Sequence, residues 1–360
     1  MSETTVSKNN RIYFLDYARV SACVLVLLVH VSAVWLDKEP VGSAGAFFVL
    51  SCNIFAFTGV TVYVMISGAL ALSQEHNSYV RIYILKSLRL LGLWLLWKIM
   101  YRLIDMIKLK TAGEIIDWKE DFFIQLITKP GHYHLWFLTM LAFVYLMVPL
   151  IKKGCEKKEN CILYLVIFSL LAVLFPTLFL FEFPFRYLLE EFYGIFDFGY
   201  FAGYLGYFIL GYFLLKHTDR EKKTVVVVML WLAAIAFFVI ACVTGNIRSI
   251  SEGAPCLLFS TPFSLHCIFL SMAGFVLVKR LDKGPKKDDK KHAILVQLSA
   301  ATLGVYLIHP FILDMMIQAG FFSAFENVWT GLPLMLLLLM LLSFIAALLM
   351  HRIPLINKIL

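Results

Sequence analysis

The chain has 360 residues, of which 61% are hydrophobic and 16% charged, and its formal net charge is +8. Soluble proteins of this length carry roughly a quarter of their residues as charges, so the composition argues against soluble domains and excludes disorder and collagen-like repeats. The seven Cys are an odd count, fall mostly inside apolar runs and lack zinc-type spacing. They therefore predict neither a disulfide framework nor a metal site.

In chain order, about ten segments are long enough to cross ~30 Å of hydrocarbon as helices that rise ~1.5 Å per residue. They are Ile12–Leu36, Val41–Gln74, Tyr79–Tyr101, Tyr133–Ile151, Asn160–Phe181, Phe198–Leu215, Thr224–Ile247, Gly253–Val278, Ala293–Leu313 and Asn327–Met350. The second is too long for one straight helix, so we expect part of Val41–Phe48 in a loop or interfacial turn. Lipid admits only helices or closed barrels, and these runs are too continuous for barrel strands. We predict an all-α, polytopic integral membrane protein with about ten transmembrane helices.

The Lys and Arg residues between these segments indicate an orientation. With a cytoplasmic N-terminus, 22 of the 32 fall in inner segments, eight in outer segments, and Arg19 and Lys98 inside the membrane. This bias follows the positive-inside rule with both termini cytoplasmic. Because the basic groups are scattered over separate loops, we expect no nucleic-acid partner. We interpret the chain as one transmembrane domain, 1–360, with a cytoplasmic tail at 1–10, an extracytoplasmic loop at 102–132 and a basic cytoplasmic loop at 279–292.

The first segment carries three polar residues that lipid should exclude, Asp16, Arg19 and His30. A charge there costs at least ~2.5 kcal/mol. The eleven residues from Arg19 to His30 place both on one helix face, ~16 Å apart, with Asp16 within ~60° of Arg19. Two interpretations stay open. In the first, Asp16 and Arg19 form an interfacial ion pair and His30 only packs against other helices. In the second, this polar face of the helix is functional, with His30 as a general base or nucleophile.

Three further segments have a structural and a functional interpretation. Arg81, Lys86 and Arg89 either reach lipid phosphates or bind a phosphorylated cytosolic cofactor. The aromatic residues of 132–137 are explained by an interfacial belt, and an acceptor-binding mouth is the other interpretation. Gly199, Gly203 and Gly206 indicate close helix packing. His309 and Asp314 match the H-x4-D pattern of glycerolipid acyltransferases, which we interpret as coincidence because nine His make chance matches common.

Five segments, taken in order, resemble the membrane acyltransferase-3 family of bacterial surface-glycan O-acyltransferases. The opening aromatic-Leu-Asp-x-x-Arg run with a later His is similar to Phe14-Leu15-Asp16-Tyr17-Ala18-Arg19 and His30. The other four are Tyr63-Val64-Met65-Ile66-Ser67-Gly68, Lys86-Ser87-Leu88-Arg89, Leu135-Trp136-Phe137-Leu138 with Tyr145 and Pro149, and Leu303-Gly304-Val305-Tyr306-Leu307-Ile308-His309. The resemblance is closest to stand-alone members that lack an SGNH esterase-like domain.

The resemblance implies ten core helices in a bacterial inner or plasma membrane. It also implies a cytosolic acyl-CoA donor, often acetyl-CoA, as co-substrate with no permanently bound cofactor. The implied acceptor is a hydroxyl of a surface glycan or a lipid-linked glycan, and the acyl group is acetyl, succinyl or another. The family's functional Arg and His correspond to Arg19 and His30.

From the residues and the resemblance together we expect three groups of site residues. The expected catalytic residues are His30, Arg19 and Asp16. The donor would be bound by Arg89, Lys86 and Arg81, and the substrate by Trp136, His134, Ser67, Tyr306 and His309. A transporter or glycan exporter without acyl-transfer chemistry is the main alternative, because intramembrane charges suit one equally well. A catalytically silent subunit of a glycan synthase is a third.

Overall fold

The structure is a computed structural model that describes residues 11–75, 78–179, 183–196, 198–218, 224–282 and 290–353, and all regular structure within these ranges is helical. The expected tail 1–10 and residues 283–289 of the expected basic loop lie outside the described residues. Seven helical segments of the described part are long and apolar enough to cross a membrane. The prediction of an all-α, multi-pass membrane protein is confirmed, whereas the total of ten spans stays a prediction.

Every expected span overlaps helical structure, but in Gly253–Val278 the helix begins only at Leu265, after turns and irregular structure over 253–264. The helices are α1 (Tyr13–Leu36), α2 (Ala44–Ala56), α3 (Thr58–Ser73), α4 (Tyr79–Thr111), α5 (Gln125–Thr128), α6 (Trp136–Cys155), α7 (Lys158–Phe168), α8 (Phe175–Leu178), α9 (Arg186–Phe196), α10 (Phe198–Lys216), α11 (Thr224–Glu252), α12 (Leu265–Leu281), α13 (Lys290–Gln318) and α14 (Val328–Met350). Irregular helical turns at Trp118–Ile124, Ser169–Leu174 and Phe321–Ala324 complete the described set.

The long second segment is divided as the sequence suggested, and once more. Its helix starts at Ala44 because the Ser43 hydroxyl accepts a hydrogen bond from the Ala46 amide at 3.0 Å, which caps the first turn. Residues 41–43 therefore form the expected loop. A second break, at Phe57, separates α2 from α3 and was not predicted, although Gly59 lies two residues further on.

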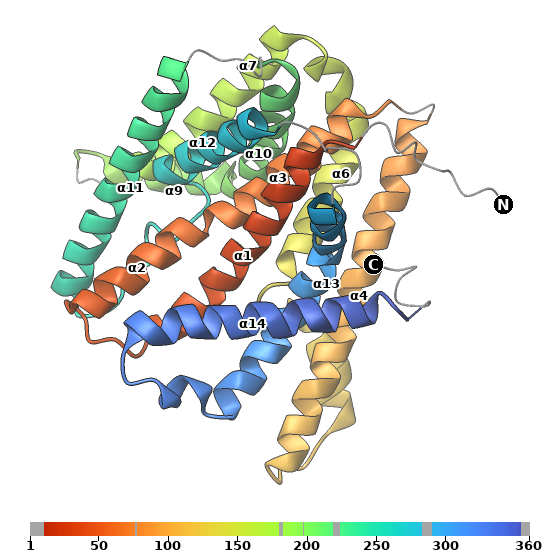
Figure 1. The fold of residues 1–360 in the computed structure, drawn as a ribbon, viewed down its shortest axis with the longest axis vertical. Coiled ribbons are helices and arrows are strands. Elements are labelled where there is room, and N and C mark those ends of the chain that lie inside the picture. Colours follow the sequence, from red (N-terminus) through yellow and green to blue (C-terminus); the bar gives the residue numbers. More distant parts are fainter. Residues whose placement is uncertain are drawn as a thin grey trace.

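Helix α4 is 33 residues long, or about 50 Å, and so reaches well beyond a hydrocarbon core. Figure 1 shows it along one side of the bundle with one end extending past the other helices. The segment expected as a loop at 102–132 thus begins as ten more residues of α4, 102–111. The turns at Trp118–Ile124 then return to this helix, where Arg102 Nε donates to the Asp121 carbonyl.

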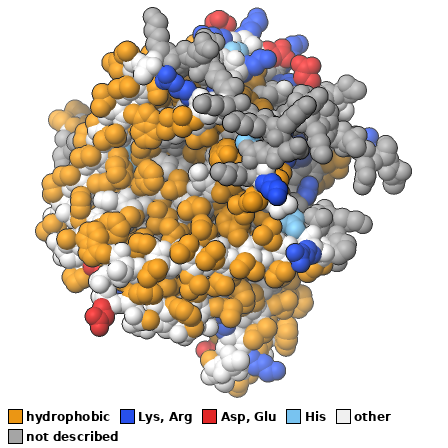
Figure 2. Space-filling model, viewed as in Figure 1, with side chains coloured by type: hydrophobic (Ala, Val, Ile, Leu, Met, Phe, Trp, Pro, Cys, Tyr) orange, Lys and Arg blue, Asp and Glu red, His pale blue; other side chains and the backbone are white. Residues whose placement is uncertain are grey.

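Helix α1 lies inside the bundle and packs against α2, α3, α12, α13 and α14 (Figure 1). The outer surface is largely apolar. On α11, for example, Val225, Met229 and Leu232 are each more than 60% exposed. Figure 2 shows a face dominated by hydrophobic side chains, with Lys and Arg gathered toward its upper and right margins. Such a surface is stable only against lipid.

Glycines set the closest helix contacts. A Cβ on Gly68 of α3 would lie 1.8 Å from the Phe208 carbonyl oxygen, and one on Gly211 of α10 would lie 1.9 Å from that of Met65. The two helices therefore cross with their backbones touching. The predicted close packing is confirmed for Gly203 and Gly206, whose Cβ positions are filled by aromatic rings of other elements. Gly199 lies among residues 196–202, whose side chains are not described.

Candidate active site

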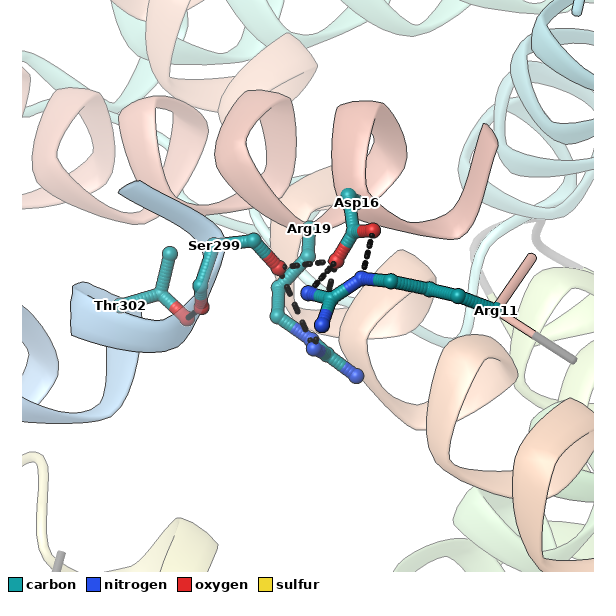
Figure 3. A network of polar contacts seen from close by, with 5 residues as sticks. All are labelled: Arg11, Asp16, Arg19, Ser299 and Thr302. Atoms are coloured by element: carbon teal, nitrogen blue, oxygen red, sulfur yellow. Dashed lines mark hydrogen bonds and ion pairs between the residues drawn. The ribbon is translucent and has the colours of Figure 1, made fainter. Parts of the chain in front are cut away.

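A network of polar side chains surrounds Asp16 near the start of α1 (Figure 3). Asp16 is 3% exposed. Arg11 donates to both its carboxylate oxygens, from Nε at 2.8 Å and from Nη2 at 2.9 Å. The Ser299 hydroxyl of α13 donates to Oδ1 at 2.6 Å and accepts from Arg19 Nη1 at 3.2 Å. Arg19 Nη1 is 3.9 Å from the same Oδ1. The buried carboxylate is therefore fully satisfied, which a charge at this depth requires.

Arg19 is held by one edge of its guanidinium. Its contacts in the described part of the chain are the Ser299 hydroxyl and the distant Asp16 oxygen, so most of its five N–H donors remain available to a ligand. The side chain lines a cavity of about 320 Å³ among α1, α3, α6 and α13. An arginine presented in this way suits recognition of a negatively charged or carbonyl oxygen.

His30 lines the same cavity as Arg19, which confirms that the two share a face of α1. The cavity also contacts four of the predicted substrate-binding residues, which are Ser67, His134, Trp136 and Tyr306. The structure thus joins segments from four separate parts of the chain in one chamber. Within the described ranges, no group of three His, Cys, Asp or Glu side chains is arranged to hold a metal ion.

Aromatic and histidine rings crowd the His30 end of the cavity. The His30 ring centroid lies 5.0 Å from those of Tyr133 and His309, and the His134 ring lies 5.6 Å from His309. His309 Nδ1 is 3.1 Å from the Val305 carbonyl oxygen. Because a carbonyl only accepts, Nδ1 carries the proton and Nε2 has a free lone pair. In the described part, that buried Nε2 has no hydrogen-bond partner.

The His309–Asp314 pairing considered from the sequence is not formed. Asp314 pairs with Lys108 of α4 at 3.1 Å, whereas His309 faces His30 and His134, so the H-x4-D match is a coincidence as expected. His309 itself is fully buried behind His30 and does not line the cavity.

The basic residues of α4 lie outside the cavity. Arg81 and Arg89 are exposed, and Lys86 is half-buried with its ammonium 4.6 Å from the Tyr83 ring centroid and 6.0 Å from that of Tyr145. The position of Arg89 falls on the exposed face of α4, and its expected role in binding the donor stays a prediction. Lys86 alone of the three packs toward the bundle.

Sequence reasoning missed Arg11 and Ser299. Arg11 was counted among the orientation charges, although its position five residues before Asp16 allows both to meet at the start of a helix. Ser299 belongs to a pattern of polar residues that the sequence itself contains. Ser299, Thr302, Tyr306 and His309 are spaced by three, four and three residues, which places them on one face of a helix. That face meets α1.

These observations define a multi-pass membrane protein in which a half-buried Arg19 and a half-buried His30 line one cavity. The family model described as "Acyltransferase domain", that of the acyltransferase-3 family, matches residues 12–352. The chain belongs to this family and is a membrane acyltransferase. No curated protein and no solved structure matches the chain closely enough to refine this assignment.

Proposed function

We propose that this protein is an O-acyltransferase of a bacterial cell membrane. It moves an acyl group, in the first instance acetyl, from cytosolic acyl-CoA to a hydroxyl of a cell-surface glycan or glycan precursor. The observation that carries the proposal is that Arg19 and His30 line the same cavity. Their separation of ~16 Å along α1 would let a donor enter from one side of the membrane and an acceptor from the other.

His30 acts as the base in this scheme. It takes the proton of the acceptor hydroxyl as the hydroxyl oxygen attacks the thioester carbonyl, and it returns that proton to the departing CoA sulfur. In the alternative scheme, His30 carries the acyl group transiently. Arg19, at the other end of the cavity, holds the donor. His309, whose ring centroid lies 5.0 Å from that of His30, packs against the base and limits the orientations of its ring.

The cavity volume of about 320 Å³ suits an acyl group and the pantetheine arm of CoA, but not the nucleotide. The nucleotide phosphates would therefore remain outside, near cations at the Arg19 end. Chain direction supports this placement, because α1 and α4 both start on the side where α3 ends, and Tyr83 of α4 donates to the Ala71 carbonyl of α3 at 2.7 Å. Lys86 and Arg11 are the best-placed cations, with Arg81 and Arg89 on the exposed surface.

The test is His30→Ala in a strain lacking the chromosomal copy, with membrane expression confirmed. We expect acylation of the surface polysaccharide, read from its mass, to fall by more than about tenfold, because general-base or nucleophilic catalysis contributes ~10²–10⁴ in rate. His217→Ala, at the end of α10, is the matched control and should acylate normally. Undiminished acylation by the His30→Ala protein would refute the role of His30.

The same strains separate an enzyme from an exporter. If the protein is an acyltransferase, the deletion strain still carries its surface polysaccharide at normal amount and with a lower mass. If the protein exports glycan, the polysaccharide disappears from the surface. A silent subunit would show neither dependence on His30 nor CoA release by the purified protein with acceptor present.

A further inference from the structure

A second cavity, of about 380 Å³, lies toward the far end of α4 and is distinct from the cavity lined by Arg19 and His30. Its walls are α4, the returning turns of 118–128 and the link that leads into α6. We call it the α4 cleft and define it by Lys98, Arg102, Asp105, Lys129 and His132. It lies about 13 Å further along α4 than Arg89, away from the basic residues that suit the donor.

The α4 cleft has an excess of positive charge. It holds three cations against one carboxylate, that of Asp105, which is 4.0 Å from Arg102 Nη1. Lys98 is 7% exposed, and its ammonium lies 4.7 Å from the Trp94 ring centroid. In the described part of the chain no carboxylate lies within 4.0 Å of that ammonium. A largely buried lysine that lines a cavity and has no anionic partner is unfavourable, so the site favours an anion from outside the chain.

Arg102 adds to this excess. Its Nε donates to the Asp121 carbonyl, while its buried Nη2 has no hydrogen-bond partner in the described residues. The stem of Lys98 is held in place by Gly131, where a Cβ would lie 3.1 Å from Lys98 Cγ and where φ is +97°. Only glycine adopts this backbone freely and leaves that room. The cleft is therefore preformed rather than assembled from mobile surface lysines.

The α4 cleft adjoins the active-site cavity through three consecutive residues. His132 lines the cleft, while Tyr133 and His134 line the cavity. His132 Nδ1 is 3.0 Å from His134 Nδ1, and the His132 ring stacks on Tyr101 with centroids 4.3 Å apart. Burial lowers the pKa of His132, which leaves the ring neutral and able to exchange hydrogen bonds with sugar hydroxyls.

We propose that the α4 cleft binds an anionic group, a phosphate or carboxylate, carried by the acceptor glycan. Lys98 and Arg102 hold that group, and the sugar hydroxyl to be acylated passes the His132–His134 wall toward His30. This inference rests on the proposed function for the identity of the acceptor. The anionic character of the proposed ligand is inferred from the charge of the cleft, and its place in the acceptor from the position of the cleft beside the cavity.

The experiment measures binding to the purified full-length protein in an uncharged detergent, without acyl transfer. The probes are glucose 1-phosphate, glucuronate, uncharged methyl glucoside and short-chain phosphatidylglycerol. We expect one or both anionic sugars to bind, methyl glucoside to bind at least about tenfold more weakly, and Lys98→Met to lower anionic sugar affinity by about tenfold or more. Lys98→Arg should restore most of it.

Lys108→Met is the matched control, because Lys108 lies on the same helix and pairs with Asp314 outside the cleft. It should change affinity by less than about twofold. Equal binding of charged and uncharged sugars, binding of the phospholipid alone, or a parallel loss of acetyl-CoA affinity in Lys98→Met would overturn the proposal. None of these outcomes depends on His30, so failure here is distinct from failure of the proposed function.

Discussion

At the scale of single residues, Asp16 determines how Arg19 is presented to the cavity. Its carboxylate accepts from Arg11 and Ser299, and Ser299 in turn receives one N–H of Arg19. A charged group this deep is stable only with such partners. The network therefore serves stability and the direction of the guanidinium at the same time.

Asp16→Asn tests both effects. The amide keeps the shape of the carboxylate but loses its charge, and it cannot accept from both Arg11 and Ser299 as strongly. We expect the free energy of unfolding to fall by about 1–3 kcal/mol and acylation to fall by about tenfold or more. Thermal unfolding of the purified protein and the polysaccharide mass measure the two.

Glu190→Gln is the comparison for that variant. It breaks the Arg186–Glu190 pair, whose atoms lie 3.4 Å apart on side chains that are 29% and 39% exposed. Such surface pairs contribute about 0–1 kcal/mol, so neither stability nor acylation should change measurably. A fully folded Asp16→Asn protein with normal acylation would show that the network does not serve Arg19.

At the scale of elements, the crossing of α3 and α10 depends on two glycines. Each Cβ position at Gly68 and Gly211 is filled by backbone of the other helix, which cannot move aside as a flexible side chain would. The Ser67–Gly68 pair therefore contributes both to the cavity and to the helix crossing. Ser67 lines the cavity, while Gly68 allows the close contact with α10.

Gly211→Ala should force α3 and α10 apart. We expect a lower melting temperature and a loss of about 1–3 kcal/mol of stability, as for overpacked cores. Gly92→Ala on α4 is the control, since nothing lies within 4 Å of its Cβ position. Alanine there favours the helix by up to ~1 kcal/mol. If both variants melted alike, the close crossing would be wrong.

The same elements show what sequence could and could not predict. Hydropathy located the spans, because a helix that crosses hydrocarbon needs a long apolar run of residues. The helical period placed Arg19 and His30 on one face, as found. It could not reveal that Arg89 faces outward, because α4 has apolar residues on every side. Nor could it place Lys98 beside Gly131, since that contact depends on how the 118–131 segment returns to α4.

At the scale of the whole molecule, charge and cavities give the protein two distinct ends. The basic residues at the starts of α1 and α4 suit a cytosolic donor. The α4 cleft and the His-rich end of the cavity lie toward the other ends of these helices. The proposed transfer from a cytosolic donor to a surface glycan requires that these ends face opposite compartments, which the distribution of Lys and Arg predicts.

Labelling of single introduced cysteines tests this orientation. Glu114→Cys lies just after the end of α4, and Lys157→Cys lies between α6 and α7. The native Cys give little background, because six of the seven are buried and Cys52 is half-buried. In intact spheroplasts, a membrane-impermeant maleimide should label Glu114→Cys, and it should label Lys157→Cys only after lysis. Equal labelling of both, or the reverse order, would contradict the orientation. It would then place the α4 cleft on the cytosolic side, where a surface glycan could not reach it.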